Sequence, residues 1–210
     1  MKTKYHIEIT QKALSDQFSE EALGDVIQGN IRQDKIRNQF GHDYIHFDGS
    51  AFEAGFDYLK QQEQAIIDHL RQDHFSAARL VFGRVTHSWQ DFYSHSNYVR
   101  LWIEKAENLP PEEIVINDPM IMNHPELKSG ENYGLIEFIA LIPPFSKWIK
   151  PTMPQDSHAR MNLDVPDAGE CFVYAYAAAL KQTVKAFQEL KILFSNAKLH
   201  QKKVRSFLGR

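Results

Sequence analysis

Hydrophobic positions at the start of the chain follow the helical period of about 3.6 residues. Over residues 5–30 they fit two short helices that break near Ser19, where the run Ser-Glu-Glu is typical of a helix start. Residues 29–50 have few periodic apolar positions and instead concentrate aspartates and histidines. We interpret this stretch as a connecting loop, and loops commonly carry ligand-binding residues.

Three further segments show the helical period. Helices are predicted over residues 51–71, from about residue 76 toward Trp102, and over residues 169–195, the last with apolar residues on two faces. The tail, residues 198–210, is rich in Lys and Arg and is interpreted as a solvated helical face. No internal repeat, low-complexity tract or alternating strand pattern of useful length occurs. The pattern therefore predicts an all-α fold.

Proline is confined to the second half of the chain. All nine prolines lie between Pro110 and Pro166. Since proline removes a backbone donor and disfavours helix in the residue before it, we predict a loop-rich insertion over residues 110–156, with a short helix near residues 133–142. The whole length, residues 1–210, suits one compact multi-helix domain.

Composition limits the classes of partner. The 210 residues are 43% apolar with a net charge of −3, so no overall charge draws the chain to nucleic acid or to an anionic membrane. The single cysteine, Cys171, cannot form an intramolecular disulfide, and we interpret it as a small buried helix residue. The N-terminus has no apolar run of signal-peptide length, and no run of roughly 18 uncharged apolar residues occurs. We therefore predict a cytoplasmic location and no transmembrane segment.

One stretch, residues 83–97, carries the most informative polar pattern. Its sequence GRVTHSWQDFYSHSN places His87, Asp91 and His95 at successive four-residue steps. On an α-helix each such step turns the side chain by about 40° and climbs about 6 Å, so all three point from one face. Imidazole and carboxylate groups are ligands of zinc and related divalent metals, and Asp91 in the centre could bridge two ions. The spacing alone also fits an ordinary polar row on a surface helix.

Three words along the chain resemble a known superfamily. The opening HIEITQKAL, the word HFDGSAFEAG and the helical word HSWQDFYSHSN are similar, in that order, to signatures of the heterokaryon-incompatibility C (Het-C) proteins and their bacterial relatives. Through them the chain resembles the zinc-dependent phospholipase C and single-strand nuclease superfamily. The resemblance implies a compact helical domain in which two or three zinc ions, or other divalent metals, hydrolyse phosphoric esters. The implied substrate is a phosphoester small molecule, a phospholipid or single-stranded nucleic acid.

The resemblance also implies roles for individual residues. Asp91 would bridge two ions; Asp34, His46 and His87 would complete one site, and His6 would contribute to the other. Asp34 would in addition orient or deprotonate the attacking water. The full set of implied metal ligands is His6, Asp34, His46, His87, Asp91, His95 and His158, with Asp34 and Asp91 as the catalytic residues.

The chain departs from the superfamily at the third ion. The longer gap after the central aspartate and the later His-x-x-x-Glu pair are missing, so His95 and His158 take those places, with Asp164 as a further candidate. Asp48 is a candidate acceptor for a ligand imidazole and equally a turn residue. In exported members the first residue of the mature chain supplies its amine to a metal. With no signal peptide visible, Met1 is not expected to do so here.

Two other interpretations stay open. His42-Asp43 resembles the doublet of helical metal-dependent phosphohydrolases, although here it follows Gly41 in an expected loop. Alternatively, the chain is a non-catalytic helical interaction protein in which metals, or merely hydrogen-bonded histidines, hold the helices together. The remaining histidines are expected at the surface or in loops; they are His69, His74, His124 and His200.

Overall fold

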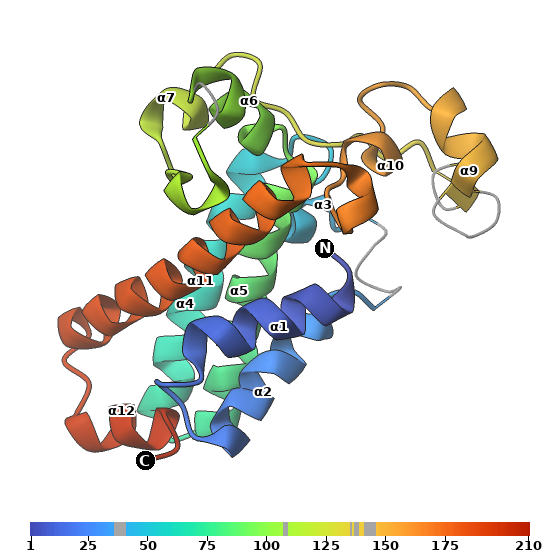
Figure 1. The fold of residues 1–210 in the computed structure, drawn as a ribbon. Helices are drawn as coiled ribbons and strands as arrows, with labels where there is room; N and C mark the ends of the chain where they lie inside the picture. Colours follow the sequence, from blue (N-terminus) through green and yellow to red (C-terminus); the bar gives the residue numbers. More distant parts are fainter. Residues whose placement is uncertain (36–40, 107–108, 135, 137–138, 141–145) are drawn as a thin grey trace.

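The secondary structure is helical in the part of the chain that the computed structural model describes, namely residues 1–35, 41–106, 109–134, 136, 139–140 and 146–210 (Figure 1). β-Structure in these ranges is limited to two isolated bridges, Ser96 with Ser129 and Glu131 with Ser157. The predicted all-α, multi-helix fold is therefore confirmed.

The longer helices carry most of the fold. They are α1 (Thr3–Leu14), α2 (Glu20–Ile31), α4 (Phe52–Arg71), α5 (Phe75–His95), α6 (Tyr98–Lys105) and α11 (Cys171–Asn196). The shorter elements are α3 (Asp43–His46), η2 (Pro111–Glu113), α7 (Pro119–Met122), α9 (Ser146–Ile149), η3 (Lys150–Thr152), α10 (His158–Met161), η4 (Pro166–Ala168) and α12 (Gln201–Phe207). α4 and α11 confirm two of the helices predicted from apolar spacing.

The two opening helices meet near Ser19, as predicted. Ser19 caps α2, because its hydroxyl oxygen accepts a hydrogen bond from the backbone N–H of Ala22 at 3.3 Å. The loop expected over residues 29–50 is wrong at both ends, since α2 continues to Ile31 and α3 places His46 on a helical turn. α2 packs against α5 and α3 against α4, and such tertiary packing overrides a weak local pattern.

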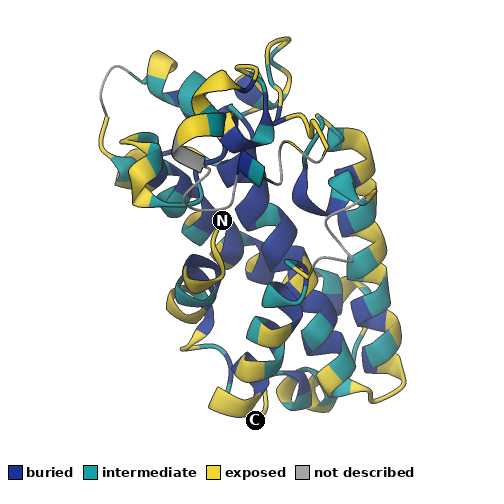
Figure 2. Ribbon diagram, turned by 90° about the vertical axis from the view of Figure 1, so that its right-hand side faces the viewer, coloured by how far each residue is buried: buried dark blue, intermediate teal, exposed yellow. Residues whose placement is uncertain are grey.

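α5 is the central helix of the domain. It packs against α2, α4 and α11 and also contacts α3 and α12, and buried residues gather along the middle of the molecule (Figure 2). Most of α5 is buried, and its buried residues include histidine, aspartate, glutamine, serine and threonine as well as apolar side chains. Because buried polar groups are unfavourable without partners, the neighbouring helices must supply them.

Close contact between α2 and α5 depends on two glycines. A methyl group on Gly29 would lie 2.0 Å from the carbonyl oxygen of Leu80, and one on Gly83 would lie 2.1 Å from that of Val26. Both distances are far inside van der Waals contact, so only glycine permits this approach. The approach brings Asn30 of α2 against the polar side of α5.

α5 ends at His95 and does not continue toward Trp102 as predicted. The backbone N–H of Asn97 donates to the carbonyl oxygen of Lys128 at 2.9 Å, and its side-chain amide donates to that of Glu126 at 2.8 Å. These bonds to a segment distant in sequence draw the chain out of the helix, and α6 begins one residue later.

The proline-containing middle of the chain has short elements where it is described. Between residues 110 and 156 these are η2, α7, α9 and η3, each of three or four residues. Half of the short helix expected near residues 133–142 lies outside the described residues, and within the other half residues 136 and 139–140 are helical. Trp148 on α9 is 80% exposed. None of the described helices is both long enough and apolar enough to cross a membrane.

Candidate metal centre

Four side chains with metal-binding atoms converge on α5. His87 and Asp91 come from α5 itself, His6 from α1, and Asp34 from the turn after α2. One ligand atom of each lies within 4.8 Å of the others. The first three are buried, whereas the Asp34 side chain is 27% exposed and lies at the rim. We call His6, Asp34, His87 and Asp91 the inner group.

Asp91 lies at the centre, and its two carboxylate oxygens face different partners. Its Oδ2 is 2.8 Å from His87 Nε2 and 2.8 Å from His46 Nδ1. Its Oδ1 is 3.3 Å from His6 Nε2 and 3.7 Å from His95 Nε2. A carboxylate placed between two sets of imidazoles in this way could serve two ions at once.

A second group forms where α5 ends. Asp48 Oδ1 lies 3.0 Å from His95 Nδ1 and 2.9 Å from His158 Nδ1. Asp164 adjoins it, with its Oδ1 3.3 Å from His95 Nε2. We call Asp48, His95 and His158 the outer group. The side chains of Asp48 and His158 are each 16% exposed, so this group is nearer to solvent than the buried part of the inner group.

Backbone hydrogen bonds hold the loops of the outer group against the end of α5. The N–H of Gly49 donates to the carbonyl oxygen of Gly130 at 2.9 Å, and the N–H of Gly130 donates to that of His95 at 3.2 Å. The N–H of His158 donates to Glu131 at 2.9 Å. A methyl group on Gly130 would lie 2.5 Å from the Cα of His158, so a glycine is required for this approach. Segments far apart in sequence thereby meet in one group.

The donor atoms fit a divalent metal ion. Three buried imidazole nitrogens make no hydrogen bond within the described part of the chain, namely His6 Nε2, His46 Nε2 and His95 Nδ1. Such atoms are unfavourable unless a bound ligand satisfies them. Bond lengths of about 2.0–2.1 Å place the ligand atoms of a tetrahedral zinc ion about 3.3 Å apart. The separations around Asp91, from 2.8 to 3.7 Å, lie on both sides of that value.

Three carboxylates of the cluster have histidines and the amino terminus as their charged partners. In the described ranges Asp48, Asp91 and Asp164 form ion pairs with histidines and with the amino group of Met1, and with no lysine or arginine. Burial acts to raise the pKa of Asp91, but the neighbouring histidines, His87 first, and the amino terminus outweigh it and hold that pKa well below 3.8. The cluster therefore carries negative charge that a divalent cation would neutralise.

The histidines differ in their affinity for protons. Burial lowers the pKa of His87 to about 4, although Asp91 opposes the shift. Burial also acts to lower the pKa of His95, but Asp91 and Asp48 outweigh it and raise that pKa well above 6.5. For His46 burial is likewise outweighed by its hydrogen bond to Asp91, so its pKa is raised. His46 and His95 therefore bind a proton more readily than a free histidine does, whereas His87 binds one less readily.

All seven side chains predicted as ligands lie in or beside the two groups. His46 belongs to neither group, but its Nδ1 is 3.1 Å from His87 Nε2. The predicted division of ligands stays a prediction: His6 shares a group with Asp34 and His87, but it lies nearest Asp91 Oδ1, whereas His46 and His87 lie nearest Oδ2. The His6 ring stacks on the His87 ring with centroids 4.4 Å apart, since α1 lies beside α5. Their role as metal ligands stays a prediction.

Met1 and Asp48 lie closer to the centre than expected. The Met1 amino group is 2.6 Å from Asp91 Oδ1 and 3.1 Å from Asp164 Oδ1, so it lies beside the candidate ligands. The expectation that Met1 does not supply its amine to a metal stays a prediction. The backbone N–H of Lys2 donates to the Asp164 carbonyl at 3.3 Å and draws the chain inward. Burial acts to lower the pKa of the amino group, but Asp164 and Asp91 raise it to about 11. Asp48 is a potential ligand in its own right, in addition to being an acceptor for histidine.

The other histidines lie outside both groups. His42 Nδ1 lies 3.3 Å from the hydroxyl of Tyr44, and Asp43 is the first residue of α3, so the His42-Asp43 doublet is not part of the cluster. His200 accepts a hydrogen bond from the backbone N–H of Lys202 at the start of α12. These contacts are local.

A layer of polar residues behind the inner group was missed from the sequence. Gln90 Oε1 lies 2.6 Å from His6 Nδ1, and Asn30 Oδ1 lies 3.4 Å from His87 Nδ1. Both amide side chains are fully buried. One signal was available, since Gln90 follows His87 by three residues and lies on the same side of a helix. Asn30 gave no such signal, because its neighbours in space come from another helix.

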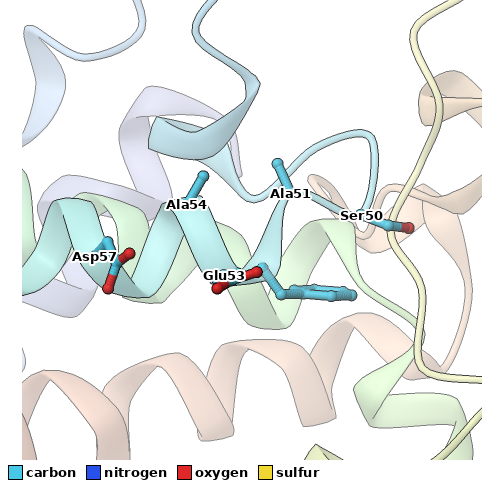
Figure 3. A pocket seen from close by; sticks show the side chains of 6 residues that line it. Ser50, Ala51, Glu53, Ala54 and Asp57 are labelled. Atoms are coloured by element: carbon cyan, nitrogen blue, oxygen red, sulfur yellow. The ribbon is translucent and has the colours of Figure 1, made fainter.

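An open depression of roughly 430 Å³ lies at the start of α4 (Figure 3), and no residue of either group is among those that line it. Glu53 and Asp57, one helical turn apart, are among the residues that line it. The full lining is Ser50, Ala51, Phe52, Glu53, Ala54 and Asp57. Acidic residues at an exposed helix start do not by themselves identify a ligand.

Comparison with known proteins identifies relatives of the chain. Residues 2–128 match the family described as the VWA7 N-terminal domain. The chain is also 33% identical over 89 residues to the von Willebrand factor A domain-containing protein 7 of Rattus norvegicus, and equally to those of Mus musculus and Homo sapiens. Each alignment covers 42% of this chain and 10% of the relative, so the chain corresponds to a small part of those proteins. No solved structure matches.

These matches correct the resemblance drawn from the three sequence words. The assignment to the phospholipase C and nuclease superfamily, and to its Het-C-like branch, is wrong, and so is the classification as a phospholipase C-like hydrolase that followed from it. The words are marked by histidine, aspartate and aromatic residues, which many helical polar clusters share whatever their ancestry. The family match covers more than half of the chain, and the chain therefore belongs to the VWA7 N-terminal domain family.

Proposed function

We propose that this domain binds at least two divalent metal ions, with zinc as the first candidate, between α1, α3, α5 and the loop that carries Asp48. One observation carries the proposal. Buried imidazole nitrogens without hydrogen bonds face carboxylates that no lysine or arginine neutralises in the described ranges. A divalent cation is the simplest ligand that satisfies both, because it accepts lone pairs and supplies positive charge.

Two sets of ligands support more than one ion. The inner group offers two imidazoles and two carboxylates, and the outer group offers two imidazoles and one carboxylate. Asp91 reaches toward both, since its Oδ1 lies 3.7 Å from His95 Nε2. His46 and Asp164 adjoin the groups and are further candidate ligands. Mixed nitrogen and oxygen donors of this kind suit zinc, while other divalent first-row metals use the same donors.

We further infer that the loaded centre activates water for cleavage of phosphoric esters. Divalent ions held close together polarise phosphoryl oxygens and lower the pKa of a bound water to about 7. Asp34 is placed to accept a proton from such a water, because its carboxylate is 27% exposed and its Oδ1 lies 3.7 Å from His87 Nε2. Asp48, His158 and Asp164 are also partly exposed, so the cluster has a side open to solvent.

A non-catalytic role for the same metals is the alternative. The groups join α1, α3, α5 and loops remote in sequence, so bound ions would also cross-link the fold. A site that serves structure alone has all coordination positions filled by protein atoms, whereas a catalytic site keeps a position for water or substrate. The partial exposure of Asp34 and of the outer group favours the catalytic role.

The test is metal analysis followed by an activity assay. Purified chain, stripped with chelator and titrated with zinc, should bind at least two equivalents, measured by elemental analysis and calorimetry. The loaded and stripped forms are then compared on a phosphodiester chromophore, on phosphatidylcholine vesicles and on single-stranded DNA. Zinc-dependent turnover of any of these supports the catalytic role, and tight binding without turnover supports the structural alternative. Failure to bind zinc or another divalent metal would refute the proposal.

A further inference from the structure

A set of fully buried polar residues forms a chain of hydrogen bonds that ends on His6. We infer that Gln90 is a positioning residue, which fixes the tautomer and direction of His6 so that its Nε2 presents a lone pair to the centre. Thr183 holds Gln90 in the orientation that does this. The functional meaning rests on the proposed metal centre, whereas the hydrogen-bond argument does not.

The first anchor of the chain is on α11. The hydroxyl of Thr183 donates its one hydrogen to the carbonyl oxygen of Ala179 at 2.8 Å. Its oxygen can therefore only accept from a further partner, and Gln90 Nε2 lies 3.1 Å away. The amide of Gln90 must present nitrogen on this side, which directs its Oε1 toward α1.

A second hydroxyl, that of Thr86 on α5, independently gives the same orientation of the Gln90 amide. The hydroxyl of Thr86 donates to the carbonyl oxygen of Gly83 at 2.8 Å, so it accepts from Asn30 Nδ2 at 3.0 Å. The same Asn30 nitrogen lies 3.1 Å from Gln90 Oε1 and donates to it. Two hydroxyls tied to helix carbonyls thus both identify Oε1 of Gln90 as a hydrogen-bond acceptor.

The tautomer of His6 follows from this orientation of the Gln90 amide. Its Nδ1 lies 2.6 Å from Gln90 Oε1, so Nδ1 carries a hydrogen and donates it. A neutral imidazole has one such hydrogen, and Nε2 is then left with a lone pair. That nitrogen is buried without a hydrogen bond and lies 3.3 Å from Asp91 Oδ1. Two electron-rich atoms face each other at this distance favourably only if a proton or a metal cation lies between them.

The use of an amide at this position also follows from the charge of the cluster. The inner group already holds two carboxylates. A carboxylate behind His6 would add negative charge in a fully buried place, whereas the neutral amide of Gln90 accepts the same hydrogen without it. The network also joins α1, α2, α5 and α11, so the direction of His6 depends on the packing of four helices.

The test uses Gln90→Met, which keeps length but removes the acceptor, and the milder pair Thr183→Val and Thr183→Ser. Zinc affinity is measured by chelator competition, and the tautomer of His6 by nitrogen NMR of ¹⁵N-histidine-labelled, metal-free protein. We expect hydrogen on Nδ1 of His6 in the unaltered chain and a shift away from it in Gln90→Met. Zinc affinity should fall about tenfold to hundredfold in Gln90→Met and by a smaller factor in Thr183→Val. Thr183→Ser, which keeps the hydroxyl, should retain the zinc affinity of the unaltered chain.

Ser88→Ala is the matched control, because the Ser88 hydroxyl is buried on the same helix and makes no hydrogen bond in the described ranges. It should leave affinity and tautomer unchanged. If Gln90→Met fails to fold, Thr183→Val against Thr183→Ser decides. Hydrogen on Nε2 of His6 in the unaltered chain would overturn the inference, and so would zinc affinities of both Gln90→Met and Thr183→Val within twofold of that of the unaltered chain. If the unaltered chain binds neither zinc nor another divalent metal, the proposed function is refuted, and the tautomer measurement still decides this inference.

Discussion

Replacement of Asp91 by asparagine is the perturbation that the geometry makes most informative. The side chain keeps its volume and one carbonyl oxygen but loses its charge. In the structure both carboxylate oxygens are engaged, with four imidazole nitrogens at 2.8 to 3.7 Å, and the residue is 1% exposed. Asp91→Asn should therefore remove the one ligand that reaches both groups, while the protein remains able to fold.

The size of the effect can be worked from the ligand count. Structural zinc sites with four protein ligands bind with about 10–16 kcal/mol, or roughly 2.5–4 kcal/mol for each ligand. At about 1.4 kcal/mol per factor of ten, the loss of Asp91 should weaken the inner ion by about a hundredfold to a thousandfold. The outer group keeps three ligands of its own, so its ion should weaken less.

The assay is zinc titration followed by elemental analysis after gel filtration. Asp91→Asn should lose at least one equivalent of zinc, together with any zinc-dependent cleavage of phosphoric esters. Asp57→Asn is the control, because it removes the same charge from a side chain that is 58% exposed and, within the described residues, forms an ion pair only with Lys60. Unchanged zinc stoichiometry and affinity in Asp91→Asn would refute the reasoning.

Three further predictions test other parts of the account. His158→Ala should remove one bound ion from the outer group, whereas His200→Ala should have no effect on zinc content; equal stoichiometry in both variants would contradict the grouping. Zinc must displace a proton from His95, whose pKa is raised because nearby carboxylates outweigh its burial. Apparent zinc affinity should therefore increase as pH rises from about 6 to about 8, by up to about tenfold per pH unit for each proton displaced, and a flat titration profile would argue against histidine ligands. Gly83→Ala should lower the free energy of unfolding by about 1–3 kcal/mol, because the added methyl group meets the α2 backbone at 2.1 Å, whereas Gly24→Ala, with nothing within 4 Å, should not; equal melting temperatures in thermal unfolding would contradict the close helix contact.

Local periodicity was sufficient to predict the helices and the polar row. The spacing of His87, Asp91 and His95 depends only on helix geometry, and all three side chains lie in the cluster. The end of α5 was not predictable in this way, because bonds from Asn97 to residues about thirty positions later decide it. The sequence around residue 97 shows no helix-breaking proline or glycine.

The deeper parts of the site depend on contacts that no local pattern reveals. Asp48 joins His95 and His158 through backbone hydrogen bonds between loops. Asn30 reaches α5 because two glycines allow the helices to touch. The family assignment failed for a related reason, since short words rich in ligand residues describe the chemistry of a cluster and carry little information on ancestry.

The helix α5 combines the apolar residues that pack in the core with the polar residues of the proposed metal centre. The apolar residues of α5 bury it in the core, and burial isolates its polar residues from water. Isolation makes unpaired imidazole nitrogens and carboxylates unfavourable, and that is the condition under which a divalent cation binds strongly.

Anomalous X-ray diffraction from crystals grown with zinc, recorded on both sides of the zinc absorption edge, tests the central claim most directly. The account predicts one anomalous peak among the inner group, about 2.0–2.1 Å from His6 Nε2 and His87 Nε2, and a second among Asp48, His95 and His158. Crystals grown with zinc that show no anomalous peak at either group, with the side chains hydrogen-bonded to one another, would contradict this prediction.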